Sequence, residues 1–199
     1  MTKEFYEWIY NTSPERWSGN VGQHGIDSNL KQYIKEYKDK KIKIIDLGCG
    51  IGTTLTSLQE YNWELYGVDY VPKAIEIAKN RLRDKAIVKV KDLNDTGFPD
   101  KFFDIVYSLG VFEHLDKPNF NEPRRIIKDD GLFMCQVPTE NDESKTGKVE
   151  TTFCINHSKG KRGTQFEMYH TEEHWKRLME ESNFQVFIPR KNIFLCKPI

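Results

Sequence analysis

The stretch "IIDLGCGIGTTL", residues 44–55, constrains the fold more than any other part of the chain. Three glycines, Gly48, Gly50 and Gly52, stand at alternate positions between an apolar run and a run of helix formers. This pattern predicts a strand, a tight turn and a helix, with turn backbone that a ligand can approach closely. An acid, Asp46, lies two residues before the first glycine. The sequence therefore predicts a ligand crevice at the end of a first strand, with a carboxylate beside it.

From residue 41 onward, short apolar runs alternate with stretches of helical periodicity. Helices are expected over residues 53–61, 72–82 and 118–127, and a last one begins after Thr171, which suits an N-cap. Strands and helices that alternate at this spacing predict βαβ units and a mostly parallel sheet, to which a closing hairpin adds an antiparallel strand. The expected strands are "KIKIIDLG", "WELYGVD", "AIVKVKD", "FFDIVYSLG", "GLFMCQVP", "FQVFIP" and "IFLCK".

Two regions lie outside this alternating pattern. Ahead of it, Phe5, Trp8 and Ile9 indicate an N-terminal helix, and residues 26–37 indicate a second one. Residues 139–170 show no clear period, and we expect them to be irregular. The length of 199 residues is that of a single domain with one core.

Composition excludes several classes of protein. Thirty basic residues balance thirty acidic ones, so no general charge favours nucleic acid or an anionic membrane as the partner. The N-terminus "MTKEFYEWIY" lacks the apolar core of a signal peptide, and no apolar run reaches about 18 residues. The four cysteines have no metal-type spacing and predict reduced thiols in a cytoplasmic protein: Cys49, Cys135, Cys154 and Cys196.

Polar residues stand at the ends of the next three expected strands. Asp69 ends the second strand at a distance from the glycines that suits an acid holding the two hydroxyls of a ribose. Asp92 ends the third strand, where a carboxylate can accept from an adenine amine, and Ser108 lies near the end of the fourth. In open α/β sheets such strand ends converge on one crevice. The alternative for each acid alone is a solvated or turn-capping carboxylate.

Two cofactor classes combine a glycine turn with a ribose acid. The dinucleotide fingerprint G-x-G-x-x-G requires a small residue at its sixth position, where this chain has Thr53. A carboxylate at Asp46 also opposes a pyrophosphate, whereas it suits a cation. S-adenosylmethionine carries a sulfonium, an ammonium, a ribose and an adenine but no phosphate. The sign of the charge therefore favours it over a nicotinamide dinucleotide, which stays as the alternative.

These motifs resemble those of class I S-adenosylmethionine-dependent methyltransferases, in the group that acts on small molecules and in ubiquinone biosynthesis. "IIDLGCGIGTTL" is similar to the family's first motif, and "LYGVDYVPKAIEIAKNR" and "VKDLNDTGFPDKFFDIVYSLGVFEHL" to the segments that follow. "RRIIKDDGLFMCQVP" resembles the fifth-strand segment, with Asp129-Asp130-Gly131 in place of the family's Pro-Gly-Gly. The resemblance implies a Rossmann-like, doubly wound α/β sheet of about seven strands with helices on both faces.

The resemblance also implies a role for each matching residue. Gly48, Cys49 and Gly50 would lie beside the methionyl part, with Asp46 ordering the turn. Asp69 would take the ribose hydroxyls and Tyr70 would lie against the adenine. The edge of the adenine would be contacted by Asp92 and Leu93, and the amino-acid end of the cofactor by Ser108 and Leu109. S-adenosylhomocysteine would be the product, and Cys49 would pack without acting as a nucleophile.

Methyl transfer from a sulfonium needs alignment and a dry site, and a proton on the acceptor needs a base. His114, beside Glu113 just past the fourth strand, is the leading candidate for that base, and packing at the next helix is its alternative. His170, with Tyr169, is the second candidate. Glu113 and His114 form half of a metal site at most, and no metal is expected.

The acceptor is expected to be a small molecule that is methylated on O, N or C by in-line displacement. Two alternatives are an NAD(P)-dependent oxidoreductase and a non-catalytic member that only binds the cofactor. Nucleic acid is disfavoured, since the chain lacks an Asn-Pro-Pro-Tyr-type motif and a basic excess. The single domain then divides into N-terminal helices forming a lid that includes Trp17 (1–40), a cofactor-binding core (41–138), a substrate-side insertion (139–170) and a C-terminal helix with a hairpin (171–199).

Overall fold

A computed structural model describes residues 3–16, 31–141, 145–154 and 162–199. Its centre is a seven-stranded sheet with the strand order β3-β2-β1-β4-β5-β10-β9. The first five of these pair in parallel, β10 is antiparallel to β5, and β9 is antiparallel to β10. The strands are β1 (Lys43–Leu47), β2 (Glu64–Asp69), β3 (Ile87–Val90), β4 (Phe103–Leu109), β5 (Ile127–Gln136), β9 (Phe184–Arg190) and β10 (Ile193–Pro198).

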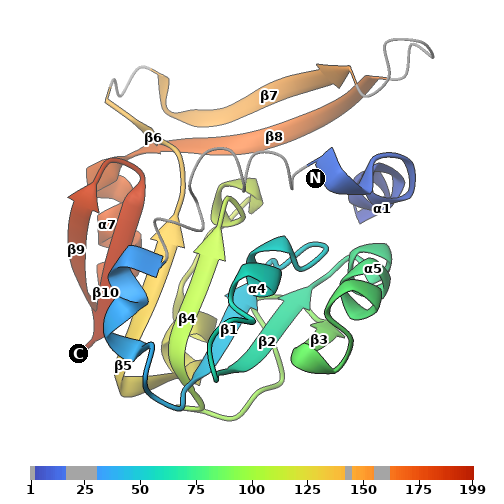
Figure 1. Ribbon diagram of the computed structural model, residues 1–199. Helices are drawn as coiled ribbons and strands as arrows, with labels where there is room; N and C mark the ends of the chain where they lie inside the picture. Colours follow the sequence, from blue (N-terminus) through green and yellow to red (C-terminus); the bar gives the residue numbers. More distant parts are fainter. Residues whose placement is uncertain (1–2, 17–30, 142–144, 155–161) are drawn as a thin grey trace.

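Helices cover both faces of the sheet, which confirms the doubly wound α/β architecture (Figure 1). Neighbouring residues of one strand belong to opposite cores: Ile44 packs with α4 and α5, while Ile45 packs with α6 and α7. Because side chains alternate along a strand, a run that is apolar at every position is buried on both faces. The helices are α1 (Lys3–Thr12), α4 (Thr53–Ser57), α5 (Pro72–Leu82), α6 (Asn121–Ile126) and α7 (Glu172–Glu181), with 3-10 turns η1 (Pro14–Arg16), η2 (Lys35–Tyr37), η3 (Arg83–Lys85) and η4 (Phe112–His114).

Local signals account for the helices that match the sequence best. α5 has the predicted bounds, with a proline in its first turn and four buried apolar residues on one side. α7 begins after Thr171, whose side chain accepts a hydrogen bond from the backbone N–H of His174 at 3.2 Å. Trp175 of this helix is fully buried in the core.

Three predicted elements have different bounds. α4 ends at Ser57, four residues before the predicted end, and continues as single turns in which the N–H of Leu58 bonds to Leu55 and that of Tyr61 to Leu58. α6 occupies only six residues of the predicted 118–127. β5 begins at Ile127 rather than at Gly131, because its first residues extend the sheet beside the start of β4.

The prediction that residues 139–170 are irregular was wrong. They contain β6 (Thr139–Glu140), β7 (Gly147–Cys154) and most of β8 (Arg162–Thr171), which form a second sheet in the order β6-β8-β7. β7 and β8 pair antiparallel over the whole length of β7. Threonine, valine and aromatic residues favour strands, but the polar residues between them leave no regular apolar alternation that would predict strands.

Two segments lie over the carboxyl edge of the main sheet (Figure 1). The β7–β8 hairpin runs across this edge, and β8 packs against η4. α1 packs against α5 beside it. Trp17, the residue expected in the lid, lies outside the described residues, as do residues 26–30 of the second predicted helix at 26–37. The rest of that segment is helical, with residues 31–34 followed by η2. Among the described residues, none of the helices has the length and apolar character needed to cross a membrane.

Candidate functional site

The glycine turn after β1 is held against the end of β2. The backbone N–H groups of Gly48 and Cys49 both donate to the carbonyl of Val68, at 2.8 and 2.9 Å. The turn then leads into α4, with Gly52 as its N-cap residue. The predicted strand, turn and helix are therefore present, and the turn lies at the carboxyl end of the parallel strands.

The turn leaves no room for side chains at its first two glycines. At Gly48, where φ is +82°, an added Cβ would come 2.5 Å from a methyl group of Val111. At Gly50, where φ is +50°, an added Cβ would come 2.9 Å from the hydroxyl oxygen of Tyr10. Both positions combine a left-handed backbone with close neighbours, so only glycine fits.

Asp69 lies at the end of β2, with 8% of its surface exposed. Its Oδ2 accepts a hydrogen bond from the backbone N–H of Gly50 and its Oδ1 from that of Val71, both at 2.9 Å. Burial raises the pKa of Asp69 to about 6, although these two hydrogen bonds lower it. Each carboxylate oxygen has a second lone pair. At neutral pH the site therefore contains a buried negative charge that additional donors would stabilise.

Asp46 and Cys49 complete the inner side of the turn. Both are buried, and Cys49 packs so closely on β2 that a Cβ on Gly67 would lie 2.9 Å from its sulfur. Burial raises the pKa of the Cys49 thiol well above its usual value, and the negative charges of Asp46 and Asp69 raise it further. A thiol held in its protonated form is a poor nucleophile, which supports a packing role for Cys49.

Tyr70 and Asp92 follow β2 and β3 at the same edge. Tyr70 is 38% exposed, and its ring meets that of Tyr6 from α1 edge-on at 5.8 Å. The Oδ1 of Asp92 accepts from the backbone N–H of Asn94 at 2.8 Å, which is the turn-capping role considered as the alternative. Leu93 is half-buried against the core on the face of the sheet that α6 and α7 cover.

The loop that contains Asp92 and Leu93 is fastened to α6. Thr96 donates from its backbone N–H and its hydroxyl to Oε1 of the buried Glu122, at 2.9 and 2.6 Å. Arg125 donates to both oxygens of the same carboxylate. This network fixes the path of the chain between β3 and β4.

The end of β4 contributes mainly backbone. Ser108 is fully buried, and its hydroxyl donates to the carbonyl of Leu47 at 2.9 Å, which ties β4 to the end of β1. Leu109 is half-buried. Gly110 follows with a φ of +69°, and its N–H donates to the carbonyl of Gln136. Ser108 therefore has a structural contact for its hydroxyl, which the sequence could not show.

The two candidate residues after this turn, Glu113 and His114, lie in η4, just past the carboxyl end of β4. Glu113 is buried, and one of its oxygens would lie 3.5 Å from a Cβ on Gly110. His114 is half-buried, and its ring meets that of Tyr6 edge-on at 6.3 Å. His114 thus lies beside α1 on η4, the turn that β8 also contacts.

His170, the second candidate base, lies at the end of β8. Its ring stacks on that of His174 at 4.1 Å and meets Trp175 edge-on at 4.9 Å. Burial lowers the pKa of His170, and the neighbouring His174 lowers it further. These contacts direct His170 toward α7.

Sequence reasoning missed two residues of the site, Tyr6 and Tyr10 of α1. Tyr6 contacts both Tyr70 and His114, and Tyr10 packs with Ile51 of the glycine turn. Together with Ile9 they form one stripe at the spacing i, i+3, i+4. The sequence predicted this helix from Phe5, Trp8 and Ile9, and nothing in that signal indicated that Tyr6 and Tyr10 would face the end of the sheet.

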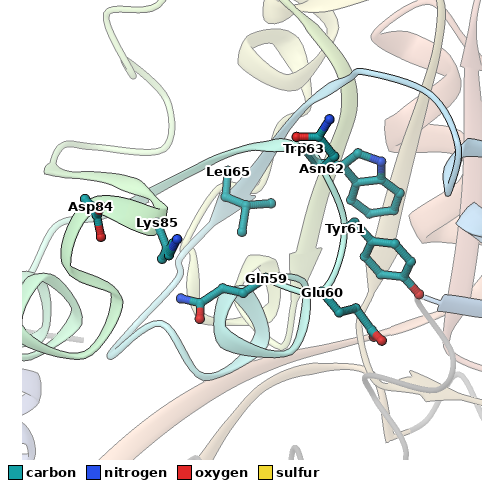
Figure 2. A pocket seen from close by; sticks show the side chains of 8 residues that line it. All are labelled: Gln59, Glu60, Tyr61, Asn62, Trp63, Leu65, Asp84 and Lys85. Atoms are coloured by element: carbon teal, nitrogen blue, oxygen red, sulfur yellow. The ribbon is translucent and has the colours of Figure 1, made fainter.

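Two further features lie apart from this edge. A hollow of about 460 Å³ lies at the amino end of β2, the opposite end of the strand from Asp69. The residues that line it are shown in Figure 2: Gln59, Glu60, Tyr61, Asn62, Trp63, Leu65, Asp84 and Lys85. The rings of Tyr61 and Trp63 stack there at 4.2 Å. Within the described ranges, no group of three or more His, Cys, Asp or Glu residues is arranged to hold a metal ion.

Comparison with known proteins decides the family. The family model of the methyltransferase domain matches residues 22–187. This chain belongs to the methyltransferase domain family. The class I resemblance of its motifs is thereby confirmed, and the glycine turn and Asp69 lie together at the carboxyl ends of β1 and β2.

Two curated relatives have methyltransferase names. A demethylmenaquinone methyltransferase from Thermotoga maritima is 31% identical over 157 residues, which cover 74% of this chain and 68% of that protein. The sterol 4-C-methyltransferase strm-1 from Caenorhabditis elegans is 25% identical over 209 residues, which cover 97% of this chain. The matched region spans only 62% of the sterol methyltransferase's length.

A solved structure shares the fold of this chain. The 1,6-didemethyltoxoflavin-N1-methyltransferase from Burkholderia thailandensis, determined with 1,6-didemethyltoxoflavin and S-adenosylhomocysteine bound, has a TM-score of 0.70. The alignment covers 99% of this chain and 87% of that one at 13% identity. At this identity the likeness shows a common Rossmann-like fold.

Proposed function

We propose that this methyltransferase moves a methyl group from S-adenosylmethionine to an O, N or C atom of a small-molecule acceptor by in-line displacement, with S-adenosylhomocysteine as the product. One observation carries the proposal. A buried carboxylate, Asp69, lies against a turn whose glycines cannot be replaced without a clash. The solved neighbour that holds S-adenosylhomocysteine supports the same cofactor.

The electrostatics of the crevice support a cation and oppose a pyrophosphate. The charges that raise the pKa of the Cys49 thiol are those of Asp46 and Asp69, and for Tyr70 they are those of Asp69 and Glu4. Each of these neighbours is acidic. A sulfonium and an ammonium are attracted to such a site, whereas the phosphates of a nicotinamide dinucleotide are repelled. The oxidoreductase alternative is therefore disfavoured by charge as well as by family.

The residues present fit the cofactor's parts. The backbone of Gly48, Cys49 and Gly50 would hold the methionyl part, and Asp69 would accept from the ribose hydroxyls with its remaining lone pairs. Tyr70 is exposed enough to lie against an adenine. The adenine edge is assigned to Asp92 and Leu93, and the amino-acid end to the backbone of Ser108 and Leu109.

When bound, S-adenosylmethionine supplies a methyl group already activated by a sulfonium. The chain's own residues align the acceptor, exclude water and receive a proton. A ring nitrogen of His114 is the proposed acceptor for the proton of a hydroxyl or amine, with Glu113 beside it, and His170 stays as the second candidate. α1 and the β7–β8 hairpin lie over the edge and restrict water.

Several wider assignments belong to the same proposal. We assign residues 1–40 to a lid, 41–138 to the cofactor core, 139–170 to the acceptor side and 171–199 to the closing helix and hairpin. The partner is a small molecule and not nucleic acid. A cytoplasmic location is supported by Cys49, Cys135 and Cys196, which are free and buried.

Label transfer tests the function. The protein is incubated with methyl-labelled S-adenosylmethionine and panels of phenols, amines, quinone precursors and sterols, beside an Asp69→Ala control. We expect label in a small molecule with the parent protein and its loss with the variant. Label that enters only nucleic acid or protein, or S-adenosylhomocysteine binding with no transfer to any panel or to a metabolite extract of the source cells, would contradict small-molecule methylation.

A further inference from the structure

The position of α1 connects the N-terminal region to the glycine turn. Tyr10 is 7% exposed and packs with Ile51 of the turn, Val71 after β2 and Ala74 of α5. Ile9, at the preceding position, is fully buried. A helix held by these contacts forms a wall beside the glycine turn, and its inward side chains face a ligand bound at that turn.

The hydroxyl of Tyr10 lies at the centre of this wall. Its oxygen is the atom nearest to an added Cβ on Gly50, at 2.9 Å. It forms no hydrogen bond with any residue in the described ranges. Burial raises the pKa of Tyr10 well above its usual value, and among the charges that raise it further Asp69 is the largest contributor. The phenol is therefore a neutral O–H donor beside Asp69 and the Gly50 backbone.

A second tyrosine of the same helix fixes the orientation of this wall. Tyr6 lies edge-on to Tyr70 at 5.8 Å and to His114 at 6.3 Å. α1 thus spans from the strand end that carries Asp69 and Tyr70 to the turn that carries the candidate base. The Tyr10 hydroxyl lies on the Asp69 side of this span.

We propose that Tyr10 is a further cofactor-binding residue, whose hydroxyl donates a hydrogen bond to S-adenosylmethionine or S-adenosylhomocysteine bound beside Asp69 and the glycine turn. The inference rests on the proposed function. Three observations carry it: the hydroxyl's place over Gly50, its lack of a partner among the described residues, and the packing that holds α1 on the turn. The cofactor site is therefore built from two parts of the chain, the sheet edge and α1.

Calorimetry with S-adenosylhomocysteine on the full chain tests this assignment. Tyr10→Phe removes only the hydroxyl, and the loss of one hydrogen bond predicts binding weaker by about three- to tenfold. Tyr61→Phe is the matched control, because Tyr61 stacks on Trp63 at the opposite end of β2 (Figure 2). This control should bind as tightly as the parent. Urea unfolding of both variants without ligand verifies that each is folded.

The outcomes separate the two proposals. Equal binding of S-adenosylhomocysteine by the parent and by Tyr10→Phe would overturn the role of Tyr10 and leave the methyltransferase proposal intact. A parent that does not bind S-adenosylhomocysteine would overturn both. Weaker binding by Tyr10→Phe and unchanged binding by Tyr61→Phe supports both.

Discussion

The buried carboxylate of Asp69 should make the stability of the ligand-free protein depend on pH in an unusual direction. Its pKa is about 6 in the folded chain, against 3.8 for an unperturbed aspartate. A pKa that folding raises means that the folded state binds the proton more tightly. The stabilisation is therefore complete below the unfolded pKa and is lost as pH rises through 6.

The magnitude follows from the two pKa values. The whole shift is worth about 3 kcal/mol, since one pKa unit corresponds to roughly 1.4 kcal/mol. Between pH 7 and pH 5 the protonated fraction of the folded state rises from about a tenth to about nine tenths, which gives about 1.3 kcal/mol of added stability. Most acidic groups act in the opposite sense, so the change has to be measured against a variant that lacks this one titration.

Urea unfolding at pH 5 and pH 7, with the parent and Asp69→Asn, isolates the effect. Asparagine does not titrate, and its NH₂ group faces one of the two N–H donors of Gly50 and Val71, so the variant is less stable at both pH values. The stability of the parent relative to the variant should be higher at pH 5 by about 1.3 kcal/mol. A difference that stays constant, or that falls toward pH 5, would show that burial does not control the Asp69 carboxylate.

Three further changes have predicted outcomes. Binding of S-adenosylhomocysteine, measured by calorimetry from pH 7.5 to 5, should weaken below pH 6 by up to about tenfold per pH unit, because a protonated Asp69 accepts fewer hydrogen bonds from the ribose. An affinity that does not change with pH would exclude the contact between Asp69 and the ribose. Gly48→Ala should lower the free energy of unfolding in urea by about 2–4 kcal/mol, since its methyl would meet Val111 at 2.5 Å. Gly147→Ala, at a positive φ but in open space, should lower it clearly less. Equal losses in the two variants would remove the steric argument. Glu122→Gln should lower stability by about 1–2 kcal/mol by weakening its contact with Arg125, while Asp129→Asn, at an exposed ion pair, should leave the thermal midpoint unchanged.

The parts of the fold that the sequence predicted are those controlled by local and periodic signals. Buried strands such as β1 and β4 are mostly apolar, and α5 carries both a proline start and an apolar face. These signals act within a few residues, so they need no knowledge of tertiary contacts. The glycine turn was predictable for the same reason, because the positive φ of Gly48, Gly50 and Gly52 is a local requirement, although Val111 and Tyr10 add long-range contacts that the sequence does not show.

Contacts between distant segments were beyond the sequence. The β7–β8 hairpin is defined by backbone pairing between its two strands, and its polar residues resemble those of a loop. The hydroxyl of Ser108 bonds to Leu47, 61 residues away, which no spacing rule indicates. Tyr10 reaches the turn only because α1 packs on α5. A side chain whose role depends on docking cannot be assigned before the docking partner is known.

The central claim is that the crevice at Asp69 and the glycine turn holds S-adenosylmethionine. Calorimetry of the parent and of Asp69→Ala, with S-adenosylhomocysteine and with NAD, tests it most directly. The parent should bind S-adenosylhomocysteine and not NAD. Asp69→Ala should remain folded but bind S-adenosylhomocysteine at least tenfold more weakly, since a hydrogen bond to a charged group contributes roughly 1.5–3 kcal/mol. Tight NAD binding without S-adenosylhomocysteine binding, or equal S-adenosylhomocysteine binding by parent and variant, would contradict the assignment.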